Sequence, residues 1–281
     1  MTHSNFNFMG NDGLNLFGRI WATSLAKPKG IVHLVHGLGE HTGRYDHIGK
    51  AMTQAGYHLV GFDLRGHGLS EGKRGHTPNF EHYLDDVDLF LEAVKKRVNN
   101  TDARFLYGHS LGANIVINHG LSRKSDLAGI ISTSPSLRLA FQPPKLKLFI
   151  GKVMEKLMPS FTMNSGLEQD ALSRDLAVVQ AYKDDVLVHD RVSAKLAMAI
   201  FESGQYALDH ASEWHLPLLL MHGSADRIAS YQAAKEFAEE IGDQATFVSW
   251  QNYYHETHNE LENKPVISKI ISWLDERTRD S

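Results

Sequence analysis

Short apolar runs bounded by glycine alternate along this chain with stretches that repeat apolar residues at helical spacing. Strands that alternate with helices pair in parallel, and parallel strands are apolar throughout because both of their faces are covered. The pattern therefore predicts an α/β fold with a mostly parallel sheet, preceded by a hairpin whose turn is Asn11-Asp12-Gly13. The predicted strands occupy 31–35, 58–62, 104–107, 127–132, 216–221 and 245–250, and the predicted helices lie near 47–55, 80–98, 111–122, 230–241 and 265–277.

One interval interrupts this alternation. Between about 137 and 210 no strand–helix repeat is visible, although several helical patterns occur there. The interval also holds four of the eight methionines, Met154, Met158, Met163 and Met198. We therefore expect residues 1–136 and 211–281 to form the core and residues 137–210 to form a helical cap inserted in it.

Composition excludes several classes of protein. The net charge is −4, so no overall positive field attracts nucleic acid. The chain has no cysteine, which rules out disulfides, thiolate catalysis and cysteine-based metal sites. The N-terminal residues lack the basic and apolar regions of a signal peptide, and the longest apolar runs are too short to span a bilayer. We expect a cytoplasmic protein.

The sharpest motif is Gly108-His109-Ser110-Leu111-Gly112, which has the form G-x-S-x-G. It follows a predicted strand and opens a predicted helix, and this is the context in which such a serine becomes an exposed nucleophile. The backbone N–H of Leu111 would then point at a developing oxyanion near a helix N-terminus. The alternative is a serine in an ordinary glycine-rich helix cap.

A second oxyanion donor is expected after the first parallel strand, where His36-Gly37-Leu38-Gly39 stands. Its glycines allow the backbone to turn so that the N–H of Leu38 can face Ser110. We interpret His36 as a structural hydrogen-bonding residue. Alone, this segment could also be an ordinary strand-to-helix loop.

A serine nucleophile needs a base and a carboxylate that orients the base, in the chain order Ser, Asp or Glu, His in this fold. Asp226 follows the strand predicted at 216–221, although it could instead cap the next helix. His255 and His258 both follow the last predicted strand, and we favour His255 because it lies nearer to the strand end. The segment is not an H-E-x-x-H zinc site, since Asn259 stands where the second histidine would be needed.

These residues and their surroundings resemble the monoacylglycerol lipases and lysophospholipase-like enzymes of the α/β-hydrolase fold. The segment 36–45 resembles the HGxGEHxGRY motif of that family, and 61–70, GFDLRGHGLS, is also similar to a family signature. The segment 255–260 resembles its HExxNE motif, in which the first histidine is catalytic. The resemblance implies a mostly parallel eight-stranded sheet flanked by helices with a helical cap. It also implies a triad of Ser110, Asp226 and His255, an oxyanion hole at Leu38 and Leu111, and no metal or other cofactor.

The expected activity is hydrolysis of a small-molecule lipid ester, above all a monoacylglycerol, through an acyl-enzyme. Alternatives are a lysophospholipase, a general short-chain carboxylesterase and, in another class, a non-catalytic scaffold. Epoxide hydrolases and dehalogenases are disfavoured because they have an aspartate where Ser110 stands. The segment 145–158 mixes apolar residues with four lysines, which is typical of a helix that contacts a membrane surface transiently or covers an apolar channel. The alternative is an amphipathic helix packed on the core.

Overall fold

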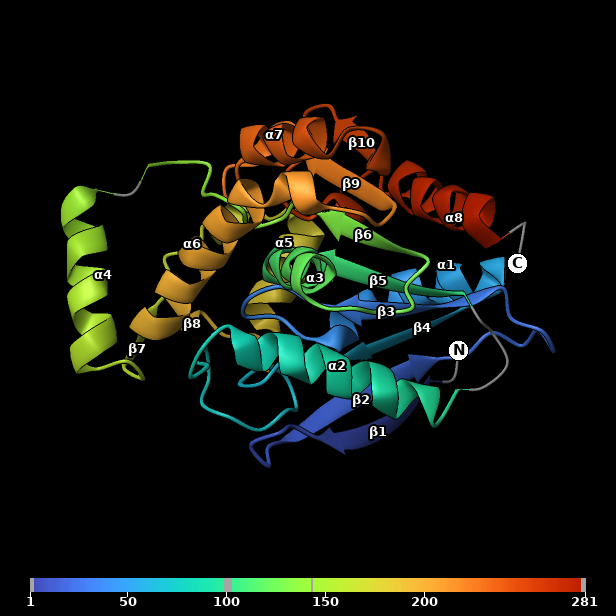
Figure 1. Ribbon diagram of the computed structural model, residues 1–281, viewed down its shortest axis with the longest axis horizontal. Helices are drawn as coiled ribbons and strands as arrows, with labels where there is room; N and C mark the ends of the chain where they lie inside the picture. The colour runs from blue at the N-terminus through green and yellow to red at the C-terminus, as the bar shows by residue number, and fades with distance from the viewer. Residues whose placement is uncertain (1–2, 99–102, 143, 279–281) are drawn as a thin grey trace.

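A computed structural model describes residues 3–98, 103–142 and 144–278. Eight strands form one twisted sheet in the order β1-β2-β4-β3-β5-β6-β9-β10 (Figure 1). β1 and β2 pair antiparallel, as do β2 and β4, and all other neighbours pair in parallel. The prediction of a mostly parallel eight-stranded sheet is confirmed. The strands are β1 His3–Met9, β2 Asn15–Trp21, β3 Gly30–Val35, β4 Tyr57–Phe62, β5 Arg104–His109, β6 Gly129–Thr133, β9 Leu218–Gly223 and β10 Ala245–Trp250.

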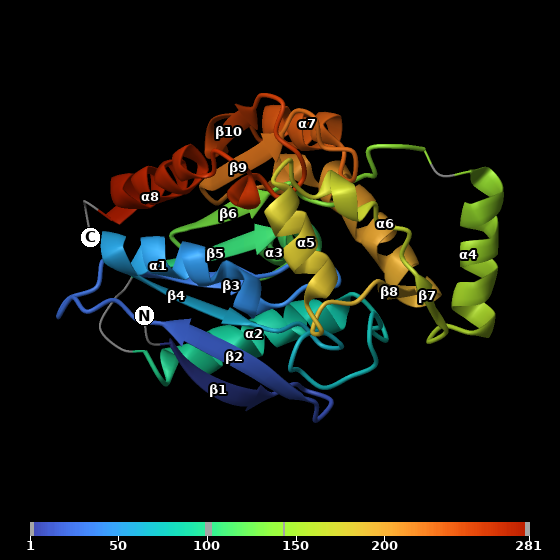
Figure 2. The ribbon, with the colours of Figure 1, turned by 180° about the vertical axis from the view of Figure 1, so that it is seen from behind.

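Helices cover both faces of this sheet, and a separate hydrophobic cluster lies under each set. Helices α1, Asp46–Ala55, and α8, Lys264–Thr278, pack over one face. Helices α2, Glu81–Lys95, α3, Leu111–Ser122, and α7, Tyr231–Ile241, pack over the other (Figures 1 and 2). Every residue of β3, β4 and β9 is buried, and in β5 all but the first residue, Arg104, are buried, which explains the mostly apolar sequences of these strands.

Two strands begin later than the apolar runs predict. β6 begins at Gly129 rather than at 127, and β9 begins at Leu218 rather than at 216. Pro217 directly precedes β9, and its missing N–H keeps it out of the strand ladder. Its carbonyl nevertheless accepts a hydrogen bond from the Ile130 N–H at 2.9 Å.

In the described residues, the segment between β6 and β9 contains three α-helices, two short 3-10 helices and a small sheet. The helices are α4 Lys145–Leu157, α5 Leu176–Asp184 and α6 Ala194–Asp209. β7, Thr162–Asn164, pairs antiparallel with β8, Arg191–Ser193, and the apolar patterns did not predict this pair. α4 stands at the outer edge of the molecule beside α6, far from the eight-stranded sheet (Figures 1 and 2).

Candidate active site

The G-x-S-x-G segment forms a tight turn between β5 and α3. Ser110 has φ 53° and ψ −113°, a conformation that non-glycine residues rarely adopt. The two glycines make this turn sterically possible. A Cβ atom on Gly112 would lie 2.0 Å from the Val35 carbonyl oxygen, and one on Gly108 would lie 2.4 Å from the Gly112 carbonyl oxygen. The turn therefore needs glycine at both positions and presents the Ser110 side chain above the carboxyl ends of the strands.

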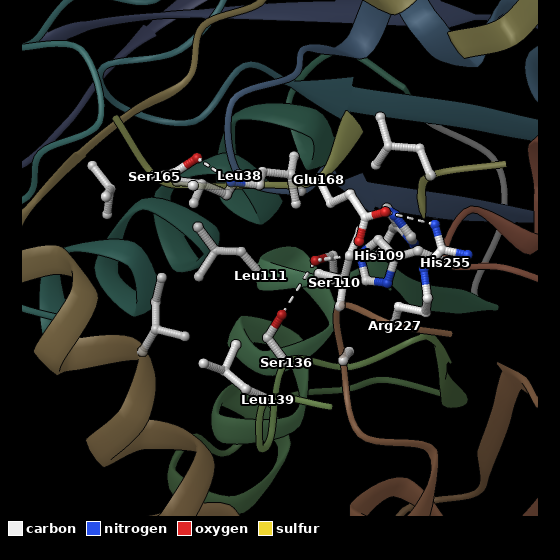
Figure 3. A pocket seen from close by; sticks show the side chains of 18 of the residues that line it. Leu38, His109, Ser110, Leu111, Ser136, Leu139, Ser165, Glu168, Arg227 and His255 are labelled. Atoms are coloured by element: carbon white, nitrogen blue, oxygen red, sulfur yellow. Dashed lines mark hydrogen bonds and ion pairs between the residues drawn. The ribbon is translucent and has the colours of Figure 1, made fainter. Parts of the chain in front are cut away.

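Three predicted residues come together at this edge of the sheet. The Ser110 Oγ lies 2.9 Å from His255 Nε2 (Figure 3). His255 Nδ1 lies 2.7 Å from Asp226 Oδ2. Each comes from the end of a different strand: Ser110 follows β5, Asp226 follows β9 and His255 follows β10. The spacing is that of a nucleophile hydrogen-bonded to a base whose other nitrogen is oriented by a carboxylate.

Asp226 is held in its ionised form by the groups around it. Its Oδ1 accepts hydrogen bonds from the Ile228 and Ala229 N–H groups, and its Oδ2 accepts from His222 at 2.9 Å as well as from His255. Burial alone would raise the pKa of Asp226, but the two histidines outweigh burial and lower that pKa. The contact of His222 with Asp226 was not predicted, because no sequence motif includes His222.

His255 is buried, and burial disfavours its protonated form. The Asp226 carboxylate outweighs burial and raises the pKa of His255 above its usual range. The Ser134 hydroxyl donates to the backbone carbonyl of His255 at 2.6 Å, which fixes the loop. The ring is therefore both positioned and made more basic, as a general base near neutral pH requires.

His258 has a different environment. It is fully buried, stacks on Tyr45 with ring centroids 5.1 Å apart, and has no hydrogen-bond partner at either ring nitrogen among the described residues. Burial lowers the pKa of His258 to about 3, so the ring is neutral over the physiological range. The geometry favours His255 over His258 as the base.

The loop that carries Leu38 is organised by Glu40. The Glu40 carboxylate accepts hydrogen bonds from the Gly37 N–H at 2.6 Å and from the Tyr45 hydroxyl at 2.8 Å. His36 is a structural hydrogen-bonding residue, as predicted: its Nε2 accepts from the Leu64 N–H at 2.9 Å. Leu38 and Leu111 both line the cavity beside Ser110 (Figure 3).

Arg44 joins this loop to the loop of His255. Its guanidinium binds both carboxylate oxygens of Glu256, at 2.6 and 2.8 Å, and one oxygen of Glu40 at 2.7 Å. Burial would raise the pKa of Glu256, but Arg44 outweighs burial and lowers it. Arg44 and Glu256 both lie in segments that resemble family motifs, but their ion pair could not be predicted from the sequence because the two residues lie 212 positions apart.

The segment inserted after β6 contacts the same loop. The His189 N–H donates to the Gly39 carbonyl at 2.9 Å, and His41 Nε2 lies 2.8 Å from Asp185 Oδ2. A Cβ on Gly39 would lie 2.3 Å from the His189 carbonyl oxygen, so glycine is required at this close approach. The inserted segment thus supports the backbone that would supply one oxyanion donor.

A largely apolar cavity of about 360 Å³ opens above Ser110. Arg227 and Glu168 form an ion pair of 2.8 Å at its wall, and Arg227 also lies over the Tyr254 ring. Apolar lining residues come from the loop that carries Leu38, from the turn between β5 and α3 and from the segment between β6 and β9, and they include Leu38, Leu111, Leu139, Phe141, Ile200 and Phe201. In the described part of the chain, no group of three or more histidine and acidic side chains is suited to hold a metal ion. Over the same residues, no helix is long and apolar enough to cross a membrane.

Comparison with known proteins places the geometry in context. The family described as Serine aminopeptidase, S33 matches residues 26–262. The chain is 31% identical to a monoacylglycerol lipase of Mycolicibacterium smegmatis over 97% of both chains. It is 35% identical to an uncharacterized abhydrolase domain-containing protein of Dictyostelium discoideum, but it spans only 30% of that protein. Among solved structures, the monoacylglycerol lipase of Paleococcus ferrophilus superposes with a TM-score of 0.83 at 31% identity, covering 99% of this chain and 100% of that one.

Proposed function

This chain belongs to the serine aminopeptidase S33 family of α/β-hydrolases, and from that premise we propose that it hydrolyses monoacylglycerols with Ser110 as nucleophile. The observation that carries the proposal is the chain of hydrogen bonds from Ser110 through His255 to Asp226, opening on an apolar cavity. An acyl chain in that cavity gains roughly 0.8 kcal/mol for each methylene that it buries.

The proposed reaction has two halves. The Ser110 oxygen attacks the ester carbonyl carbon while His255 takes the hydroxyl proton, and Asp226 stabilises the imidazolium. The N–H groups of Leu38 and Leu111 receive the oxyanion. The tetrahedral intermediate then collapses, and the bond from the carbonyl carbon to the glycerol oxygen breaks. The glycerol leaves with the proton from His255. His255 then deprotonates a water molecule, which attacks the carbonyl carbon of the acyl-enzyme. The bond from that carbon to the Ser110 oxygen breaks, His255 returns the proton to this oxygen, and the fatty acid is released.

The charges around the cavity favour a neutral head group. Two arginines line the cavity, and both are already paired: Arg227 with Glu168 at 2.8 Å and Arg138 with Glu236 at 3.1 Å. A phosphate group would compete with these carboxylates, whereas the hydroxyls of glycerol can accept from an arginine and donate to a carboxylate. This supports a monoacylglycerol over a lysophospholipid.

The test is a panel of esters. We expect kcat/KM for monooleoylglycerol to exceed the values for lysophosphatidylcholine and for p-nitrophenyl acetate. An oleoyl lysophosphatidylcholine has the same acyl chain as monooleoylglycerol but a different head group, and p-nitrophenyl acetate lacks the long acyl chain. A preference for the phospholipid would make the enzyme a lysophospholipase, and a preference for the acetate would make it a short-chain esterase.

We infer that residues 137–210 act as a cap and that α4 contacts the surface of a membrane or lipid aggregate. The apolar side chains of α4 that support this contact are largely exposed, Leu146, Phe149 and Leu157 by 69%, 65% and 73%. Lys152 and Lys156 are exposed on the same helix, while the side chains of Lys145 and Lys147 lie outside the described part. Cations near an anionic interface strengthen such binding. The cytoplasmic location stays a prediction.

A further inference from the structure

A second serine hydroxyl faces the proposed nucleophile. Ser136 lies on the loop after β6 and lines the cavity, and its Oγ is 3.2 Å from the Ser110 Oγ (Figure 3). Among the described residues, this is the one hydrogen bond that the Ser136 side chain makes. No motif marks Ser136, and the mechanism derived above does not use it.

Two hydrogen bonds hold the backbone of Ser136 to the turn between β5 and α3 and to α3 itself. Its N–H donates to the Ser110 carbonyl at 3.2 Å, and its carbonyl accepts from the Asn114 side-chain amide on α3 at 2.8 Å. These bonds hold the Ser136 Cβ beside the nucleophile, and in the observed rotamer the hydroxyl reaches the Ser110 Oγ. The contact is therefore built by the same turn that presents the nucleophile.

Counting protons sets the direction of the hydrogen bond between the two hydroxyls. The ionised Asp226 only accepts, so His255 Nδ1 carries a proton, and in the form of the ring that acts as base Nε2 accepts. Ser110 has a single proton and donates it to Nε2. Ser136 is consequently the donor and Ser110 the acceptor in the bond between them.

We propose that Ser136 is a further catalytic residue, whose hydroxyl stabilises negative charge on the Ser110 oxygen. Charge grows on that oxygen as it loses its proton to His255 during acylation. It grows again when the oxygen leaves the carbonyl carbon during deacylation and regains the proton. Hydrogen bonds to a charged oxygen are stronger than bonds to a neutral one, so the donor lowers both barriers. One lone pair of Ser110 accepts from Ser136, and the other remains free for attack.

The inference rests on the proposed role of Ser110, but not on the lipid nature of the substrate. The experiment measures the rate of covalent labelling by a fluorophosphonate and, separately, the acylation burst and steady-state turnover of p-nitrophenyl butyrate. Removing the donor with Ser136→Ala should slow labelling, acylation and deacylation by about tenfold each, at an unchanged melting temperature. Ser136→Thr keeps the hydroxyl and should recover most of the rate.

The pH profile separates a chemical role from a structural one. Among the described residues the Ser136 hydroxyl bonds Ser110 and not His255, so Ser136→Ala should lower the plateau of kcat/KM and leave its acidic limb in place. Ser132→Ala, on β6 and away from the cavity, is the matched control and should behave as wild type. Wild-type rates in Ser136→Ala, or a threonine variant as slow as the alanine variant with both folded, would overturn the proposal. Failure of Ser110→Ala to abolish labelling would instead refute the role of Ser110.

Discussion

Replacing Leu146, Phe149 and Leu157 with serine would test whether α4 selects lipid substrates. These side chains are exposed by 69%, 65% and 73%, so the change removes little packing and should leave the fold stable. Fully burying a side chain of this kind gains about 1.5–3 kcal/mol, so the exposed two thirds could contribute roughly 1–2 kcal/mol each at a lipid surface. The three together offer roughly 3–6 kcal/mol, and half of that corresponds to a loss of roughly ten- to a hundredfold in membrane partitioning of the triple variant.

The assay combines vesicle flotation with two activities. Binding to anionic vesicles and hydrolysis of monooleoylglycerol in those vesicles should fall together, because substrate is reached through the surface. Hydrolysis of soluble p-nitrophenyl butyrate should stay within about twofold, since small esters gain little from α4. Leu25→Ser with Leu261→Ser is the control, as both leucines lie in connecting segments outside α4 and are exposed by 50% and 59%.

Two results would contradict the proposed role of α4 in the selection of lipid substrates. Unchanged flotation would show that α4 does not contact the lipid surface. Equal loss of both activities in a variant with wild-type melting temperature would show that α4 supports the catalytic centre rather than the choice of substrate.

Further predictions concern the triad and its surroundings. Asp226→Asn should lower kcat by about ten-thousandfold by favouring the wrong imidazole tautomer, and activity within tenfold of wild type would assign the orienting role elsewhere. The wild-type kcat/KM should rise with pH, and the midpoint of this rise should lie above about 6.5 because Asp226 raises the pKa of His255. A midpoint clearly below about 6.5 would contradict the raised pKa. His258→Phe should retain activity, unlike His255→Ala, as steady-state assays of both variants would show. The pKa of His258 is about 3 in the folded protein and about 6.5 in the unfolded chain, so the free energy of unfolding falls as the pH drops below about 6.5. This decrease amounts to at most about 1.4 kcal/mol per pH unit, and His258→Phe should abolish it. Urea unfolding of both proteins at pH 7 and pH 5 measures the difference. Glu168→Gln should free Arg227 and raise the ratio of lysophosphatidic acid to monoacylglycerol hydrolysis several-fold, and an unchanged ratio would show that this ion pair does not choose the head group.

Much of the fold could be predicted because its signals are local. Continuous apolar runs mark buried parallel strands, and the residues that the site needs follow directly after three of them. Ser110, Asp226 and His255 could be chosen for that reason, since parallel strands bring their carboxyl ends to one edge. The choice between His255 and His258, three residues apart, rested on distance from the strand end and on the resemblance to the HExxNE motif, and the geometry favours it.

The remainder of the site depends on approaches between distant segments. His222 and Ser136 follow no motif, and their contacts with Asp226 and Ser110 arise only when the loops after β9 and β6 are packed. Arg44 and Glu256 are both visible in the sequence, but their ion pair joins two loops across the sheet edge. The β7–β8 pair is short and lacks an alternating pattern, so its three-residue strands gave no detectable signal.

The proposed mechanism depends on Ser110 as the nucleophile of a serine hydrolase. The most direct measurement is to treat the wild-type protein and Ser110→Ala with a fluorophosphonate and locate the adduct by peptide mass spectrometry. We expect stoichiometric modification of Ser110 in the wild type and none in the folded variant, with ester hydrolysis lost in parallel. An adduct on another residue, or labelling that persists in Ser110→Ala, would contradict the account.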